Sequence, residues 1–127
     1  MEWKYGERLS KENISDVEEE FGVELPKKCV SIFSEHNKGK PTESHFDIRS
    51  REGCIVDYLV DLSEAKKIAG RIGETHFIPL ATDPFGNYIG YKIDRMGNIS
   101  KIVFWDHENG EEIFVSDSLK DFISMLY

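Results

Sequence analysis

The sequence has 127 residues, of which 39% are hydrophobic and 31% charged, and its formal net charge is -8. This length predicts a single domain over residues 1–127 that buries roughly two thirds of its unfolded surface, and the composition excludes a disordered tail. No basic face is long enough to neutralise a row of phosphates, so direct nucleic-acid binding is not expected; an acidic protein attracts basic proteins, although solubility alone also explains the charge.

Neither a secretory signal nor a membrane span is expected. The N-terminal stretch MEWKYGERLSKEN lacks an apolar run, and no apolar stretch has the length that crosses a bilayer. Cys29 and Cys54 fall in different expected elements, which indicates reduced, partly buried thiols. We therefore expect a cytoplasmic protein.

Two helices are expected in the first third of the chain. The first begins near Ser10, a capping residue, and ends at Gly22, which suits a left-handed cap. Its apolar stripe consists of Ile14, Val17 and Phe21. The second begins at Pro26, which suits a first helical turn, and ends in the loop 37–41.

Short strands dominate the rest of the chain. An alternating strand is expected over 45–49, and after a turn at 51–53 another over 54–62. A short helix capped by Ser63 covers 63–72. The remaining strands are expected over 76–83, 88–94, 99–108 and 111–115. Asn109–Gly110 predicts a hairpin through a type I′ turn. Residues 116–118 then cap a last helix with one apolar side, formed by Leu119, Phe122, Ile123 and Leu126.

This order predicts the α+β class. Consecutive strands joined by tight turns form a mainly antiparallel sheet. The sheet packs with the two N-terminal helices, one short inserted helix and a C-terminal helix. Within 99–108, Val103 and Trp105 alternate with Phe104 and Asp106, so one pair is expected to face the helices and the other to be partly exposed. Trp105 is interpreted as a core anchor in preference to a ligand platform.

The stretch IVFWDHENGEEIF, residues 102–114, gathers acidic side chains around one histidine and is tested first for metal binding. An EF-hand loop with Gly110 at position 6 would place Trp105 and His107 at positions 1 and 3, and Ser116 at position 12, where oxygen ligands are required. The four histidines have no second histidine or cysteine at zinc-ligand spacing. No metal site is expected, with a site assembled from distant residues left open.

Catalysis is not expected either. Exposed carboxylates beside a turn keep ordinary pKa values and lack the desolvation that tunes a general acid or base. Both cysteines lie in apolar patterns, and the sequence holds no Gly-x-Ser-x-Gly motif and no glycine-rich phosphate cradle. A catalytic carboxylate cluster stays an open alternative, and no cofactor is expected.

The ordered signals resemble the SUKH superfamily, which includes the yeast Smi/Knr-type cell-wall regulators. The first similar stretch comprises Ile14, Val17-Glu18, Phe21-Gly22, Leu25-Pro26, Cys29, Ile32-Phe33, Asn37 and Gly39. The second, more specific one comprises Ile78-Pro79-Leu80-Ala81, Asp83, Phe85-Gly86-Asn87 and Val103 to Glu108; Ser116 to Leu119 with Phe122 resembles the closing helix. Three positions depart from the pattern: Cys29 stands where an aromatic is usual, Lys38 interrupts a double glycine, and Ser116 replaces an alanine.

The resemblance implies a protein-binding module. Bacterial members are similar to immunity proteins that bind and neutralise a toxin, often a nuclease, whereas eukaryotic members resemble regulatory hubs; the alternative is therefore a scaffold module of the Smi/Knr type. A nuclease needs a basic cleft, to which clustered carboxylates would be attracted. The candidate partner-binding residues are Asp83, Asp94, Asp106, Glu108, Glu111 and Glu112. For each one, a solvated turn is the competing interpretation, and the protein is expected to be a monomer.

Overall fold

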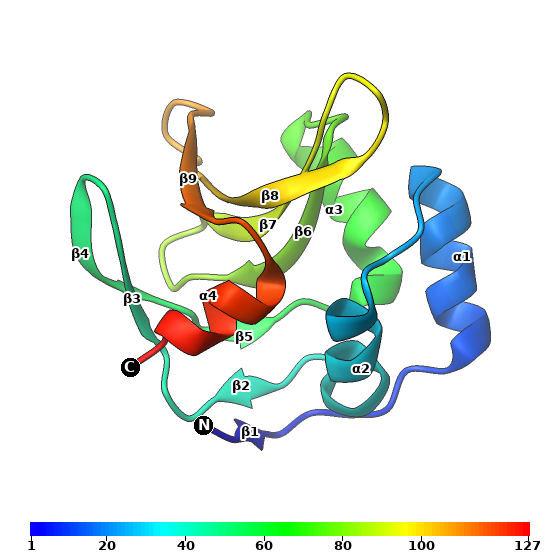
Figure 1. Cartoon of the computed structure of the whole chain (residues 1–127), viewed down its shortest axis with the longest axis horizontal. Helices are drawn as coiled ribbons and strands as arrows, with labels where there is room; N and C mark the ends of the chain where they lie inside the picture. Colours follow the sequence, from blue (N-terminus) through cyan, green and yellow to red (C-terminus); the bar gives the residue numbers. More distant parts are fainter.

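The computed structural model describes residues 1–127 and combines four α-helices with antiparallel sheets, which confirms the α+β class (Figure 1). The first half contains β1 (Trp3–Lys4), α1 (Lys11–Phe21), α2 (Lys27–His36), β2 (Lys40–Pro41), β3 (His45–Ile48), β4 (Arg51–Ile55) and β5 (Tyr58–Leu59). The second half contains η1 (Leu62–Glu64), α3 (Ala65–Ile72), β6 (Phe77–Thr82), β7 (Tyr88–Ile93), β8 (Ile99–Trp105), β9 (Glu112–Ser116) and α4 (Leu119–Met125). No helix has the length and apolar character that a membrane crossing requires.

The caps of α1 are those that the sequence predicts. The Ser10 hydroxyl accepts a hydrogen bond from the Asn13 backbone N–H, with 3.1 Å between the heavy atoms. Gly22 has a φ of 67°, a left-handed conformation that costs glycine nothing, and its N–H bonds the last carbonyls of the helix. Pro26 stands directly before α2, whose first residue is Lys27. Local sequence signals therefore fix both helices.

The expected strand over 54–62 is wrong, because this segment belongs to two sheets. β4 pairs with β3 in a separate hairpin, whereas β5 forms an edge of the five-stranded sheet. The expected turn at 51–53 lies inside β4, and the chain reverses at Arg49–Ser50. Gly53, with a φ of 65°, sits where the pairing register shifts, and its N–H donates to Asp47 Oδ1 over 2.8 Å. The glycine thus accommodates a bulge rather than a turn.

The expected cap at Ser63 is also wrong, since Asp61 fills this role. Asp61 Oδ1 accepts hydrogen bonds from the N–H and the hydroxyl of Ser63, at 3.1 and 2.7 Å. The same oxygen accepts one from the side-chain amide of Asn37, which is fully buried. Asn37 Oδ1 in turn accepts the Leu62 N–H over 2.9 Å. This polar link fastens the end of α2 to the start of the inserted helix.

The main sheet has the strand order β5-β6-β7-β8-β9, with every pair antiparallel. The backbones of two strands approach closely at Gly90 of β7, which faces Pro79 beside a register shift in β6. A Cβ at Gly90 would lie 2.0 Å from the carbonyl oxygen of Ile78. Only glycine fits there.

The main hydrophobic core lies between one face of this sheet and the helices. It contains 25 buried residues, and its helical members come mainly from α1, α2 and α4, together with Leu62 of η1 and Ala65 at the start of α3. Phe46 of β3 joins it, with its ring centroid 5.2 Å from that of Phe122 in α4. The chain end also pairs with the hairpin: His45 and Tyr127 exchange two backbone hydrogen bonds of 2.9 Å.

The second face of the sheet is buried as well, which corrects the expectation for β8. Val103 and Trp105 form a small cluster with Phe77, against which Ile72 of α3 packs. Phe104 belongs to the main core. Because α3 covers one face and the main core the other, neither alternating pair of β8 is exposed. Trp105 is 7% exposed, as expected for a core anchor, and its indole N–H donates to Glu74 over 3.0 Å.

Candidate functional site

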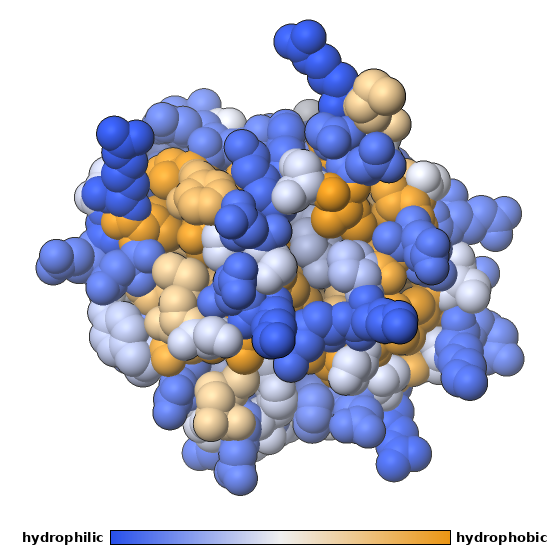
Figure 2. Space-filling model, in the orientation of Figure 1, coloured by the Kyte–Doolittle hydropathy of each residue, from blue (hydrophilic) through white to orange (hydrophobic).

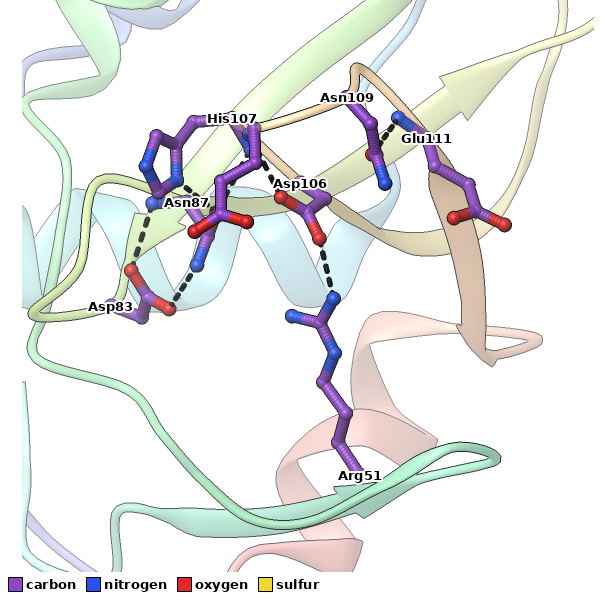
Figure 3. Close-up of polar contacts among 8 residues, drawn as sticks. Arg51, Asp83, Asn87, Asp106, His107, Asn109 and Glu111 are labelled. Atoms are coloured by element: carbon purple, nitrogen blue, oxygen red, sulfur yellow. Dashed lines mark hydrogen bonds and ion pairs between the residues drawn. The ribbon is translucent and has the colours of Figure 1, made fainter.

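A groove of about 530 Å³ opens at the end of the sheet where the β6–β7 and β8–β9 loops meet the β3–β4 hairpin. Figure 3 shows Arg51 extending from the hairpin toward Asp106, beside the Asp83, Asn87 and His107 side chains. In Figure 2, hydrophobic surface gathers between the positions of β4 and β9. The apolar lining of the groove includes Phe85, which is 69% exposed. Three of the six candidate carboxylates line this groove: Asp83, Asp106 and Glu108.

Asp83, Asn87 and His107 form a chain of hydrogen bonds. The Asp83 carboxylate is buried and accepts the backbone N–H groups of Phe85 and Asn87, at 2.9 and 2.8 Å, and the Asn87 side-chain amide at 2.7 Å. Asn87 Oδ1 accepts the His107 backbone N–H at 2.9 Å and lies 2.6 Å from its Nδ1. An amide oxygen only accepts, so Nδ1 carries a proton and Nε2 faces away from this contact. Asp83 is therefore a support of the loops.

Asp106 is a buried charge with one cationic partner. Its side chain pairs through Oδ2 with the guanidinium of Arg51, and its Oδ1 accepts the Glu108 N–H over 2.9 Å. The Arg51 Cζ lies 5.2 Å from the centroid of the Phe104 ring, a cation–π distance. The hydrogen bond from Arg51, followed by that from the Glu108 N–H, holds the pKa of Asp106 below its usual range. The expectation of an exposed carboxylate with an ordinary pKa is wrong here, because Arg51 arrives from a distant strand.

This depressed pKa predicts a specific loss of stability in acid. The unfolded Asp106 takes up its proton near pH 4, and the folded one only at a lower pH, so the ion pair stabilises the fold fully above about pH 4. We expect the difference in unfolding free energy between the wild type and Asp106→Asn to shrink as the pH falls through the folded pKa. Urea unfolding at a series of pH values measures this difference, and Glu111→Gln, which removes an exposed carboxylate without an ion pair, is the control. A constant Asp106→Asn difference down to about pH 2 would show that the pair adds no stability.

The other four candidates divide into two kinds. Asp94 lies in the β7–β8 loop, away from the groove, where its Oδ1 accepts the N–H groups of Met96 and Asn98. Glu112 on β9 pairs with Lys92 over 2.7 Å. Glu108 and Glu111 are exposed and form no ion pair. Only these last two present free carboxylates to solvent.

The loop that carries both glutamates is longer than predicted. The hairpin between β8 and β9 is confirmed, but the type I′ turn is wrong, because only Gly110, at φ 72°, has the required positive φ. The Gly110 N–H donates to the Asp106 carbonyl over 2.7 Å, and the Asp106 N–H to the Glu111 carbonyl over 2.9 Å. Asn109 Oδ1 accepts the Glu111 N–H over 2.9 Å, so the side chain stabilises the loop.

Sequence reasoning missed Arg51, and it named Asn87 only within the family resemblance and not as a candidate site residue. A repeated motif points to Asn87: the β6–β7 loop is Asp-Pro-Phe-Gly-Asn and the β7–β8 loop is Asp-Arg-Met-Gly-Asn. In each, the aspartate accepts backbone N–H groups two and four residues ahead, and the glycine has a positive φ. No local signal identifies Arg51, whose partner lies 55 residues away.

The groove presents charged and hydrogen-bonding side chains. No group of three or more His, Cys, Asp or Glu side chains is arranged to hold a metal ion. Cys54 lines the groove, and burial raises the pKa of its thiol. Cys29 is buried in the main core, where burial raises its pKa to about 12. Neither thiol is prepared as a nucleophile.

One comparison with known families covers most of the chain. The family model SUKH_6, described as SMI1-KNR4 cell-wall, matches residues 11–123. The match spans the groove loops and both N-terminal helices. No individual curated protein matches the chain.

Proposed function

The chain belongs to the SUKH superfamily, and from this membership we propose that it is a non-catalytic immunity protein that binds and neutralises a basic toxin domain. We propose that residues 1–127 act as a single SUKH-like domain, as a monomer in the cytoplasm. The proposed partner is a nuclease-type toxin, whose phosphate-binding cleft carries positive charge.

The display of Glu108 and Glu111 on a braced loop is the observation that carries this proposal. The ion pair between Asp106 and Arg51 anchors the start of the loop to the β3–β4 hairpin. Asn87 Oδ1 accepts the backbone N–H of the next residue, His107. A loop that is ordered before binding loses less conformational entropy when a partner binds. Two free carboxylates at its tip would also accelerate association with a basic surface through long-range attraction.

The six candidate carboxylates take different parts in this proposal. Glu108 and Glu111 are the proposed contacts, because they are exposed and unpaired. Asp83 and Asp106 are proposed supports, since both are buried and use their oxygens within the chain. Glu112 is proposed as a rim residue beside Lys92, and Asp94 as a turn residue remote from the contact.

Charge reversal at the loop tip tests the contact. We expect Glu108→Lys with Glu111→Lys to slow association with the proposed basic toxin domain by at least about tenfold at low salt, and to abolish most of the salt dependence. Stopped-flow association at several salt concentrations measures the rate, and growth during co-expression scores protection.

A matched control uses the other exposed acidic stretch. Glu19→Lys with Glu20→Lys on α1 changes the net charge by the same amount at exposed positions. This variant should still protect against the toxin. Its association rate should fall only slightly, because charges far from the contact contribute little to the attraction in the presence of salt. If it fails to protect while the loop-tip variant protects normally, α1 is the contact surface and the proposal for the loop is wrong.

A regulatory or scaffold module of the Smi/Knr type is the second candidate function. It is favoured by Phe85 and Phe114, which are 69% and 51% exposed and would suit an apolar protein contact. Phe85→Ser separates the two: it should abolish a scaffold contact centred on this ring, whereas steering of a basic toxin by the glutamates should persist. If Phe85→Ser abolishes binding to a cellular protein, and neither this variant nor the wild type protects against a toxin, the scaffold role is favoured.

A further inference from the structure

A second groove, of about 460 Å³, lies beside α3 and shares no lining residue with the groove beside the β8–β9 loop. Its walls come from α3, from the edge strand β5, from the start of β7 and from the loop that precedes β2. We call it the α3 groove. Three cations and two tyrosines line it: Lys38, Lys67, Arg71, Tyr58 and Tyr88. Its size is in the range of sites for small organic molecules.

The cations of the α3 groove are poorly neutralised by the protein itself. Lys67 has no ion-pair partner, and the hydrogen-bond partner of Arg71 is the neutral hydroxyl of Tyr88, 3.3 Å from Nη2. Lys67 and Arg71 stand four residues apart on one helix, where like charges repel. In a chain with 24 acidic and 16 basic side chains, such an unpaired set is notable, and a bound anion would relieve its repulsion.

Lys38 occupies a conformation that favours glycine. Its φ is 68°, in the left-handed region that non-glycine residues rarely adopt. Its side chain lines the α3 groove, where its charge acts on Asp61, and its one ion pair is with Glu7, at 3.6 Å between exposed groups. The left-handed backbone conformation costs a lysine energy that a glycine would avoid. We therefore infer that the lysine side chain has a role that offsets this cost.

The aromatic side chains supply a stacking surface next to these cations. Tyr58 is 47% exposed on β5. Tyr88 rests against Trp105, with 6.1 Å between ring centroids, and faces the groove beside Arg71. Of the two carboxylates in the lining, Asp61 is already bonded to Asn37 and Ser63, whereas Glu64 is exposed without an ion-pair partner. A free carboxylate accepts hydrogen bonds from hydroxyl groups.

We propose that the α3 groove binds a nucleotide. Lys67 and Arg71, with Lys38 opposite, hold the phosphate; the tyrosine rings stack against the base; and Glu64 accepts hydrogen bonds from the sugar hydroxyls. The ligand is either a free nucleotide or the terminal nucleotide of a strand, which share this chemistry. This proposal does not depend on toxin neutralisation.

Titration with a nucleotide and its fragments tests the proposal. Adenosine monophosphate should bind at least about tenfold more tightly than adenosine or inorganic phosphate alone in calorimetry, because it combines stacking with charge. In the Trp3→Phe variant, Trp105 is the remaining tryptophan, and its fluorescence should change on binding through Tyr88. A 5′-phosphorylated oligonucleotide that binds as tightly as the monophosphate identifies the strand terminus as the ligand, and a much weaker one identifies the free nucleotide.

Substitutions locate the site. Lys67→Gln with Arg71→Gln should weaken adenosine monophosphate binding by at least about tenfold. Lys38→Gly should weaken it too while the melting temperature stays the same or rises, a combination that a purely structural lysine would not give. The control Arg95→Gln with Lys101→Gln removes two charges at a different groove of the surface and should leave binding unchanged. Equal binding of phosphate and adenosine monophosphate, or an equal loss in the control, would overturn the proposal.

Discussion

Replacing Gly90 with alanine should destabilise the protein by about 4 kcal/mol or more, the range of the most severe single substitutions. The added Cβ would lie 2.0 Å from the Ile78 carbonyl oxygen, 2.8 Å from its carbon and 2.9 Å from the Pro79 Cα. All three are backbone atoms, so no side chain can rotate away. The strands β6 and β7 would have to separate at the centre of the sheet, where they carry the core residues Ile78 and Ile89.

Urea unfolding, followed by circular dichroism, measures this loss. Gly70→Ala is the matched control, because Gly70 lies in α3 and a Cβ there meets nothing within 4 Å. Alanine is the better helix former, so the control should gain roughly 1 kcal/mol. If Gly90→Ala stays within about 1 kcal/mol of the wild type, the approach of the two strands is looser than the structure gives.

Replacing Asp83 with alanine should cost about 3 kcal/mol. The substitution removes three hydrogen bonds to a carboxylate and leaves the side-chain amide of Asn87, a residue only 5% exposed, without its partner. Asn87 would then no longer fix His107, and the loop that bears the glutamates would lose one of its supports. Stability and partner binding should therefore fall together, although Asp83 itself is buried.

The repeated loop motif gives this prediction its control. Asp94→Ala removes the equivalent aspartate from the β7–β8 loop, where Asn98 is exposed and two backbone hydrogen bonds are lost. We expect a loss of about 1 kcal/mol there, since water replaces the partner. Urea unfolding compares the two variants, and the nitrogen chemical shifts of His107 report whether Nδ1 stays protonated. Equal losses would mean that the buried amide contributes nothing.

Elements encoded by neighbouring residues were predictable from the sequence. The caps at Ser10 and Gly22 are confirmed, as is a cap within 116–118, where Ser118 fills the role, and each cap depends on residues within a few positions. The hairpin at Asn109–Gly110 was also correct, but its turn type was not, because Asp106 and Glu111 close a wider loop. Local signals therefore predict the positions at which the chain turns, but they predict the type of turn only in part.

Long-range contacts decided the features that sequence reasoning missed. The alternation of side chains along β8 predicts which residues share a face of the strand. It does not predict that α3 covers the face formed by Val103 and Trp105. Asp106 looked like an exposed carboxylate because nothing near it in the sequence announces Arg51. For the same reason the sequence does not tell which of the six candidate carboxylates are unpaired, and only the fold separates the two free glutamates from the others.

The arrangement of α2 and α4 has a consequence for how the chain reaches its folded state. Both helices contribute to one core, and Figure 1 shows the two ends of the chain near one another. Contacts between residues so far apart in sequence form only after a large entropic loss, which slows folding relative to helical bundles of local topology. Neither half of the polypeptide can bury its apolar residues alone, so a ribosome-bound fragment lacking Phe122 and Leu126 should remain a substrate for chaperones and proteases until synthesis passes them.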